Sequence, residues 1–440
     1  MDGRIRTHGL AWPCCILAPK QTWKSKTSWS IWNRDYEYKE MRILQIFNRY
    51  VQEGGEQQAV QETESGLAPE HEVKTLLFDT RDWEGKNGVG QKVQQALAMV
   101  WNPKSIRTAK ETIAEFRPDV IVLHNMMPVG SAALLYWLTR QAIPVVQYIH
   151  NFRPFSVNGY LWAGDQVERA GLRLNFIPEI KDGAWQDSRV KTLWYAMILW
   201  GLHALGVWKK MTHWIAISQF MKETFAEAGI PADKMSVVRH AWEPAEKLVP
   251  RTSFEASMPF VFLGRLSAQK GIGTLLEAWT QVEKASPEAK LVICGEGPME
   301  QAVRDFAEGR DHVTYMGFVR GEKKEALLRG ARCLLAPSIW YEGLGLVAYD
   351  GYEYGLPVVA AKSGGLAEIV MNDETGFLVP PRDSEALADG IVRMLGLPDG
   401  GLAMGFQGRK WLEKSATREQ WKKEMLSVFT KLHPDSGNLN

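Results

Sequence analysis

The chain has 440 residues, 45% of them hydrophobic, and its 52 Lys and Arg residues almost balance its 51 Asp and Glu residues. This length excludes a single small module, since domains usually contain about 100–200 residues. A net charge of +1 argues against the strongly basic face that general nucleic-acid binding requires, so we expect no nucleic-acid partner. The four cysteines show neither a disulfide pattern nor a zinc-type spacing, which indicates a reducing, cytoplasmic compartment.

The first forty residues differ from the rest of the chain. Residues 1–40 have neither helical nor alternating hydrophobic periodicity, so we expect a poorly ordered leader outside the working protein. Arg4 and Arg6 precede a short apolar run, as in a signal peptide, but Pro13 interrupts that run and export is not favoured.

From Met41 onward, short apolar runs alternate with segments of helical period, which is the pattern of parallel sheets covered by helices. The first half predicts a Rossmann-like domain over residues 41–245. Its expected strands lie at residues 42–48, 71–79, 119–124, 144–149, 213–217 and 235–238.

A loop rich in Pro, Glu and Arg at residues 242–259 is the expected domain linker. A second Rossmann-like domain is predicted over 255–415, followed by a helix and tail at 416–440 that we expect to pack back on the first domain. The fold class is therefore α/β, with two doubly wound domains facing across a cleft that holds the ligand. The expected strands of the second domain lie at residues 260–263, 290–294, 313–316, 331–337, 356–361 and 376–379.

Residues 151–212 form a tryptophan-rich insertion in the first domain. Its uncharged stretch, 192–208, is shorter than the ~20 apolar residues that cross a bilayer. Two interpretations remain: a helix packed on the first domain, or a helix that contacts membrane headgroups through residues 184–210. The second interpretation rests on tryptophans flanked by cations, namely Trp162, Trp185, Trp194, Trp200 and Trp208.

Two strand-to-helix loops of the second domain carry candidate chemistry. Gly264 and Arg265 precede Lys270 and a helix N-terminus, an arrangement that suits a diphosphate, although a solvated basic loop explains it equally well. Glu342 and Asp350 are eight residues apart, about two helical turns, and two carboxylates at this spacing can bind sugar hydroxyls or simply face solvent.

These motifs resemble one family. GRLSAQKG at 264–271, GEGP at 295–298 and PSIWYEGLGLVAYDGYEYGLP at 337–357 are similar to the nucleotide-sugar domain of the retaining GT-B glycosyltransferases of family 4. The first half adds Gly54 and Gly55 after the first strand, and the likeness covers residues 41 to about 432. The resemblance implies a GT-B fold and a hexosyltransferase-type enzyme.

The resemblance also implies roles for single residues. Glu342 matches the family's glutamate beside the transferred sugar, and His150 matches its active-site histidine; both are the expected catalytic residues. Asp350 stands where the family has a ribose-binding glutamate. His124, at a similar strand end, is a candidate on the acceptor side. The expected donor-binding set is Arg265, Lys270, Gly343, Leu344, Gly345, Leu346, Asp350, Gly55 and Gly264.

The reaction implied is transfer from a nucleotide-diphosphate sugar to a carbohydrate or lipid-linked acceptor, with retention, in surface polysaccharide or glycolipid assembly. The chain has no Asp-x-Asp pair, so we expect no metal and no cofactor. The resemblance therefore implies a cytoplasmic enzyme that lies peripherally on the inner face of the membrane. Two alternatives stay open: a GT-B isomerase or epimerase of nucleotide sugars, and a non-catalytic nucleotide-sugar-binding scaffold.

Overall fold

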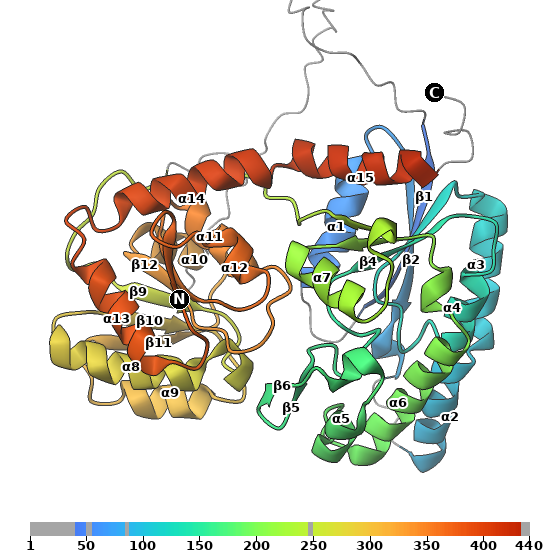
Figure 1. Ribbon diagram of the computed structural model, residues 1–440, viewed down its shortest axis with the longest axis horizontal. Coiled ribbons are helices and arrows are strands. Elements are labelled where there is room, and N and C mark those ends of the chain that lie inside the picture. The colour runs from blue at the N-terminus through green and yellow to red at the C-terminus, as the bar shows by residue number, and fades with distance from the viewer. Residues whose placement is uncertain (1–39, 50–54, 84–87, 245–249, 433–440) are drawn as a thin grey trace, which may run out of the picture. The chain divides into compact units, whose positions relative to one another are not determined.

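The computed structural model describes residues 40–49, 55–83, 88–244 and 250–432 (Figure 1). The expected leader up to residue 39, the centre of the expected linker and the tail after residue 432 lie outside the described residues, as does Gly54.

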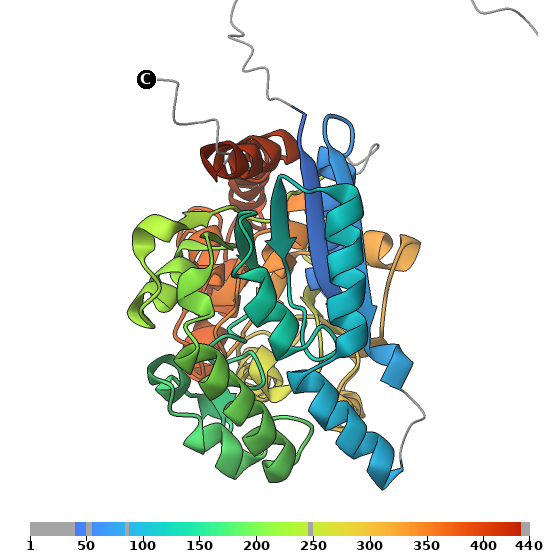
Figure 2. The ribbon, with the colours of Figure 1, turned by 90° about the vertical axis from the view of Figure 1, so that its right-hand side faces the viewer.

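The first sheet has six parallel strands in the order β2-β1-β3-β4-β7-β8 (Figure 2). β1 is buried at six consecutive positions, because helices cover both faces of the sheet and every side chain must be apolar or paired. All six expected strands are confirmed within two residues. They are β1 (Arg42–Arg49), β2 (Glu72–Asp79), β3 (Val120–Leu123), β4 (Val145–Ile149), β7 (His213–Ala216) and β8 (Met235–Val237).

The helices of this half begin at recognisable caps. The Asn102 side chain accepts hydrogen bonds from the amides of Lys104 and Ser105, and Pro103 occupies the first position of α3, where its missing N–H costs nothing. The other helices around this sheet are α1 (Gly55–Leu67), α2 (Val89–Val100), α4 (Ala132–Leu138) and α7 (Gln219–Glu227), with α3 at Pro103–Phe116.

The insertion folds as a hairpin followed by two helices. The hairpin pairs β5 (Trp162–Ala163) with β6 (Gln166–Val167). α5 (Ile177–Asp182) and α6 (Arg189–Ala204) follow, and one face of α6 is buried through Tyr195, Leu199 and Leu202. α6 therefore packs on the first domain through this face, while its other face carries the exposed Val190, Leu193 and Met197. No described helix is long and apolar enough to span a bilayer.

The second sheet also has six parallel strands, in the order β11-β10-β9-β12-β13-β14. Its core includes the fully buried Trp279 and Phe260, whose rings meet edge to face at 6.0 Å. All six expected strands are again confirmed. They are β9 (Phe260–Leu263), β10 (Leu291–Cys294), β11 (Val313–Gly317), β12 (Cys333–Ala336), β13 (Val358–Ala361) and β14 (Gly376–Val379).

Both sheets reverse their strand order next to their first strand, between β1 and β3 and between β9 and β12. Ligands of doubly wound sheets bind outside the carboxyl ends of the strands at such points. The loops after β3, β9 and β12 are therefore the places to look for chemistry. The helices around the second sheet are α8 (Ile272–Ala285), α9 (Glu300–Ala307), α10 (Glu322–Arg329), α11 (Leu346–Glu353), α12 (Leu366–Ile369) and α13 (Ser384–Leu395).

The last two helices connect the halves. α14 (Leu402–Ser415) packs on α11 of the second half, and α15 (Arg418–Leu432) packs on α1 of the first (Figure 1). Trp421 is 2% exposed and lies against Gly66, where an added Cβ would come within 2.5 Å of its ring. Lys422 pairs with Glu70 at the edge of this contact.

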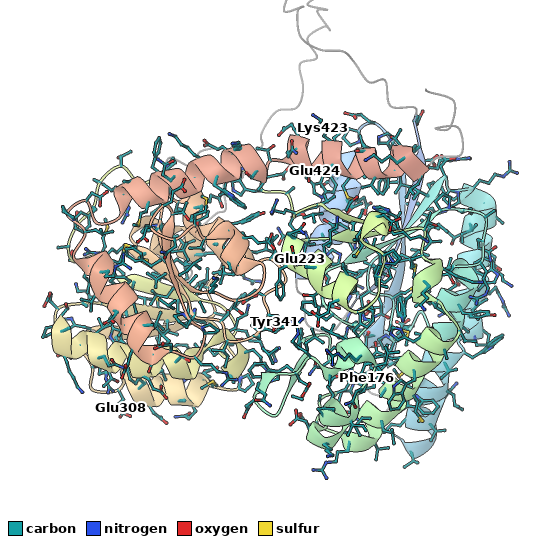
Figure 3. All side chains as sticks on the ribbon, in the orientation of Figure 1. Phe176, Glu223, Glu308, Tyr341, Lys423 and Glu424 are labelled. Carbon is teal, nitrogen blue, oxygen red and sulfur yellow. The ribbon has the colours of Figure 1, made fainter. Side chains whose placement is uncertain are left out.

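Trp421→Ala should lower the free energy of unfolding by about 3–5 kcal/mol, because it leaves a cavity between α15 and α1. Urea denaturation followed by circular dichroism measures the change. Lys423→Ala is the matched control on the exposed side of the same helix (Figure 3) and should stay within about 0.5 kcal/mol of the parent. Equal stability of the two variants would contradict the packing of α15 on α1.

Candidate functional site

The loop after β9 holds the expected basic pair. Gly264 ends the strand region and Arg265 is exposed, while Lys270 closes a short 3-10 turn before α8. Gly271 follows with φ of +74°, and a Cβ there would lie 1.9 Å from the Pro337 carbonyl oxygen. Only glycine permits this approach, which draws the loop after β9 against the end of β12.

Lys270 and Glu342, 72 residues apart, form an ion pair at this point. Lys270 Nζ lies 2.7 Å from Glu342 Oε1, which also accepts a 2.5 Å hydrogen bond from Ser338 Oγ. Glu342 is 6% exposed. Burial by itself raises the pKa of Glu342, but Lys270 and the Ser338 hydroxyl outweigh it and hold the pKa below the usual 4.5. Glu342 is therefore an anion at neutral pH.

Lys270→Ala should lower the free energy of unfolding at pH 7 by about 1–3 kcal/mol, because it leaves a buried carboxylate without its cation. The Lys270→Ala/Glu342→Gln double variant should regain most of this loss. The pKa of Glu342 is lowered by folding, so the pair stabilises the fold above pH 4.5 and the difference between parent and Lys270→Ala should vanish in acid.

Urea denaturation at pH 7 and at a series of pH values below 4.5, over which the difference should shrink as the pH falls, checks this prediction. Arg265→Ala changes an exposed cation of the same loop and should leave stability within about 0.5 kcal/mol of the parent. A Lys270→Ala variant as stable as Arg265→Ala would show that the pair is not stabilising.

The loop after β12 leads into α11 and touches the first half. A Cβ on Gly343 would lie 3.3 Å from the His150 carbonyl oxygen, so this loop and the end of β4 are neighbours. Gly345 has φ of +93° and caps α11, which leaves the amides at the start of that helix available to an anion. Leu344 is buried, and Leu346 is the first residue of α11.

Asp350 lies on α11 and already has a cation. Its Oδ1 accepts a 2.8 Å hydrogen bond from Lys324 Nζ on α10, and both side chains are about one third exposed. The structure thus adds Lys324 to the place where the resemblance implies ribose contact.

Further contacts join the two halves around these loops. The Glu368 carboxylate accepts hydrogen bonds from the amides of Gln219 and Phe220 at the start of α7, and it lies 3.2 Å from Arg239. Tyr341, labelled in Figure 3, accepts a 2.9 Å hydrogen bond from Arg169 of the insertion. The loop that carries Glu342 is therefore held against the first half from two sides.

Both histidines expected from the first half lie in one network. His124 follows β3 and His150 follows β4; His124 Nδ1 is 2.9 Å from His150 Nε2, and the two rings are parallel within 3°. Burial, together with His240, lowers the pKa of His124 to about 3. Burial and the neighbouring rings hold the pKa of His150 well below 6.5. Both rings are neutral at pH 7.

The partners of Gln45 fix the direction of this network. Its amide group donates to Val60 O and Thr75 Oγ1, so its oxygen faces His124 Nε2 at 3.2 Å. His124 must therefore donate through Nε2, and its Nδ1 accepts the hydrogen of His150 Nε2. His150 Nδ1 consequently presents a bare lone pair, shielded from water and without a hydrogen-bond partner among the described residues.

Gln45→Met should disturb the direction of these hydrogen bonds, because His124 Nε2–H loses its acceptor while the volume of side chain 45 is nearly kept. Nitrogen NMR of the histidine rings should show only the Nε2–H form of His150 in the parent and a mixture of forms in the variant. His203 donates through Nε2 to Pro154 O and should not change. A single unchanged His150 form in Gln45→Met would contradict the assigned direction.

The sequence did not single out several residues of the same pocket. His240 lies beside this pocket and stacks on His150 with ring centres 5.3 Å apart. Glu56 lies in the first turn of α1 and accepts a hydrogen bond from Asn151 Nδ2. Burial raises the pKa of Glu56 to about 7 against the opposing effects of Arg153 and Asn151. The pocket is lined by Glu56, His124, His150, Asn151, Arg153 and Tyr195 among others. The sequence signal that could have identified Glu56 is its position directly after Gly55.

Gly55 is the remaining residue of the first half that was expected to bind the donor. Gly55 opens α1, beside Glu56 of the histidine pocket, while Gly54 lies outside the described residues. Within the ranges that the structure describes, no group of three or more His, Cys, Asp or Glu residues forms a metal site. The structure therefore gathers Lys270, Glu342 and the start of α11 on one side, and the histidine pair on the other, with Gly343 touching His150.

Two family models match this chain. The model described as Glycosyltransferase Family 4 matches residues 54–245, and the model described as Glycosyl transferases group 1 matches residues 259–396. Together they cover three quarters of the 440 residues, one in each half.

Curated relatives and solved structures agree with these matches. An uncharacterized glycosyltransferase of Methanocaldococcus jannaschii is 32% identical over 198 residues, which is 41% of this chain and 50% of that protein. The GDP-mannose-dependent alpha-(1-6)-phosphatidylinositol monomannoside mannosyltransferase of Mycobacterium tuberculosis is 30% identical over 230 residues, 48% of this chain and 58% of that protein. The matches thus span about half the length of these relatives.

Among solved structures, HepE of Anabaena in complex with UDP-glucose aligns with a TM-score of 0.60 and 16% identity, over 89% of this chain and 100% of that one. This likeness confirms the fold class, two Rossmann-like domains of the GT-B type.

Proposed function

This chain belongs to the group 1 glycosyltransferases of family 4, and we propose that it transfers a sugar from a nucleotide-diphosphate donor to a hydroxyl of an acceptor. The observation that carries the proposal is the buried Lys270–Glu342 pair at the mouth of the second sheet, beside the open amides of α11. A cation, a carboxylate and free amides together suit a sugar diphosphate.

The donor diphosphate is assigned to the loop after β9. Arg265 is exposed and can reach an anion, and Lys270 can exchange its carboxylate partner for phosphate oxygens. The amides from Gly343 to Leu346 face the same anion, and Asp350 with Lys324 takes the ribose. HepE, which shares the fold, binds UDP-glucose, which supports a nucleotide sugar as the donor class.

We propose that protein groups, and not a metal ion, stabilise the charge that develops in the reaction. As the bond from the anomeric carbon to phosphate oxygen breaks, negative charge grows on the departing diphosphate, where Arg265, Lys270 and the start of α11 lie. Fixed cations and amides can supply this stabilisation by themselves. We propose a metal-independent reaction with retention, in which the acceptor oxygen attacks from the face the phosphate leaves and passes its proton to that phosphate.

Glu342 and the histidine pocket hold the transferred sugar. Glu342 is anionic and can accept hydrogen bonds from sugar hydroxyls, and His150 Nδ1 offers a second acceptor from the opposite side. His124 leaves that lone pair without a hydrogen-bond partner among the described residues by accepting the hydrogen of His150 Nε2. We assign His124 to positioning rather than to direct contact with the acceptor.

The acceptor is proposed to be carbohydrate or lipid-linked, with the enzyme peripheral on the cytoplasmic face of a membrane. The name of the Mycobacterium tuberculosis relative, a phosphatidylinositol mannoside mannosyltransferase, supports a glycolipid acceptor. Residues 184–210 remain the proposed contact. Two of the five tryptophans behind this interpretation are engaged within the protein, because Trp208 is 7% exposed and Trp200 donates its indole N–H to Leu174 O.

A thermal-shift panel of UDP, GDP and ADP sugars tests the proposal. A donor at 100 times its Kd should add about 2.7 kcal/mol of stability. Arg265→Ala and Lys270→Ala should abolish this shift, and Asp350→Glu should keep it. With that donor and an acceptor, turnover should survive EDTA, and proton NMR should show the anomeric configuration of the donor in the product.

Other outcomes reject the proposal in distinct ways. A shift without any donor turnover, unchanged in Asp350→Glu, would favour a binding scaffold. Conversion of the sugar without an acceptor would favour an isomerase or epimerase. No shift with any donor would remove the premise that this loop binds a diphosphate.

A further inference from the structure

A second cavity lies on the first half, away from the ion pair and the histidines. It has a volume of about 450 Å³, within the range of about 300–1,000 Å³ for small-molecule sites. It is open to solvent on one side and is bordered by α2, α4 and α6, helices that can be followed in Figure 2. Its walls are apolar and include Val100, Ala133, Tyr136, Met197 and Gly201.

The surface around this cavity is also apolar. α2 exposes Val89, Val93, Leu97 and Val100 at intervals of three or four residues, which places them on one side of the helix. α6 exposes Val190, Leu193 and Met197 in the same way. Ten of the sixteen exposed large hydrophobic side chains among the described residues lie on α2, α4, α6 or directly after them. Such a concentration marks an interaction surface.

The charges of the same elements have a single sign. α2, α4 and α6 contain Lys92, Arg189 and Lys191 but no Asp or Glu, and Arg140, Lys209 and Lys210 follow closely after α4 and α6. Arg140 stands at the rim, 3.3 Å from the centre of the Tyr136 ring and bonded to Leu205 O. An occupant with an apolar body and an anionic end is complementary to this surface.

We propose that the cavity between α2, α4 and α6 takes one hydrocarbon chain of an anionic membrane lipid, with the surrounding cations on its headgroups. The walls favour a hydrocarbon chain over a peptide, because a bound peptide needs hydrogen-bond partners for its backbone. The indole N–H of Trp194, a polar group of the wall, already donates to Ala96 O at 3.0 Å.

This inference goes beyond the transferase activity, since lipid binding requires only the three helices. It also concerns that activity, because Leu202 lines both this cavity and the pocket of His150. The lipid chain therefore lies behind a wall of the histidine pocket.

Gly201→Leu tests the inference by filling the cavity. A Cβ on Gly201 meets no heavy atom within 4 Å, so the larger side chain enters the cavity without displacing backbone. Gly201→Ala is the matched control, since it makes the same change of backbone freedom in α6 but leaves most of the volume empty.

Purified full-length protein is mixed with phosphatidylglycerol–phosphatidylcholine vesicles whose acyl chains are brominated, and tryptophan fluorescence is recorded. The parent and Gly201→Ala should be quenched, and Trp101→Phe should lose part of that signal because Trp101 lines the cavity. Gly201→Leu should bind the vesicles at least tenfold more weakly. Pure phosphatidylcholine should bind the parent weakly, because the cations then lack anionic headgroups.

Two results would overturn the inference: vesicle binding by Gly201→Leu equal to that of Gly201→Ala, or no quenching of the parent. A mass that depends on protein concentration, without vesicle binding, would assign the surface to a second copy of the chain. The donor-induced thermal shift of Gly201→Leu is measured in parallel. A Gly201→Leu variant that keeps the donor-induced shift but loses lipid binding supports the inference. If the parent itself shows no donor-induced shift, that result contradicts the proposed function and leaves the inference unaffected.

Discussion

A buried carboxylate needs a cation, and in this protein the pairing of Glu342 with Lys270 organises the whole mouth of the second sheet. The two residues come from different loops, so their contact requires the chain after β9 and the chain after β12 to meet. Gly271 makes this contact possible, since a Cβ there would collide with the carbonyl of Pro337, and Gly364 after β13 lies equally close to the backbone of Glu342. The site is therefore built by close backbone approach first and by charge second.

Both cations and carboxylates proposed for donor binding are paired within the protein. Lys270 is neutralised by Glu342, and Asp350 is neutralised by Lys324. A donor would exchange partners within a site that is already charged and assembled, instead of creating the charges as it binds. Such preorganisation limits the reorganisation needed when charge develops on the leaving group.

The fold was accessible from the sequence because its strands are buried on both faces. Such strands must be continuous apolar runs, so β1, β9 and β13 were visible without any partner being known. Lys270 and Glu342 were accessible through motif spacing. The roles of His240, Glu56 and Gln45 were not, because their meaning comes from neighbours far away in the chain, such as His150 and His124. Trp200 could not be placed for another reason: α6 is apolar on most of its surface, and composition cannot distinguish its packed side from its outer side.

The hydrogen-bond chain from His150 through His124 passes through the amide of Gln45 before it reaches Thr75 and Glu64, and an amide is a poor carrier of protons. Among the described residues, a proton captured by His150 Nδ1 therefore has no efficient hydrogen-bonded route away through the protein interior. It must return through the mouth of the pocket, to the substrate or its leaving group. The inner side of the histidine pair is shielded from bulk solvent. The molecule that occupies the pocket therefore governs the protonation state of the pair.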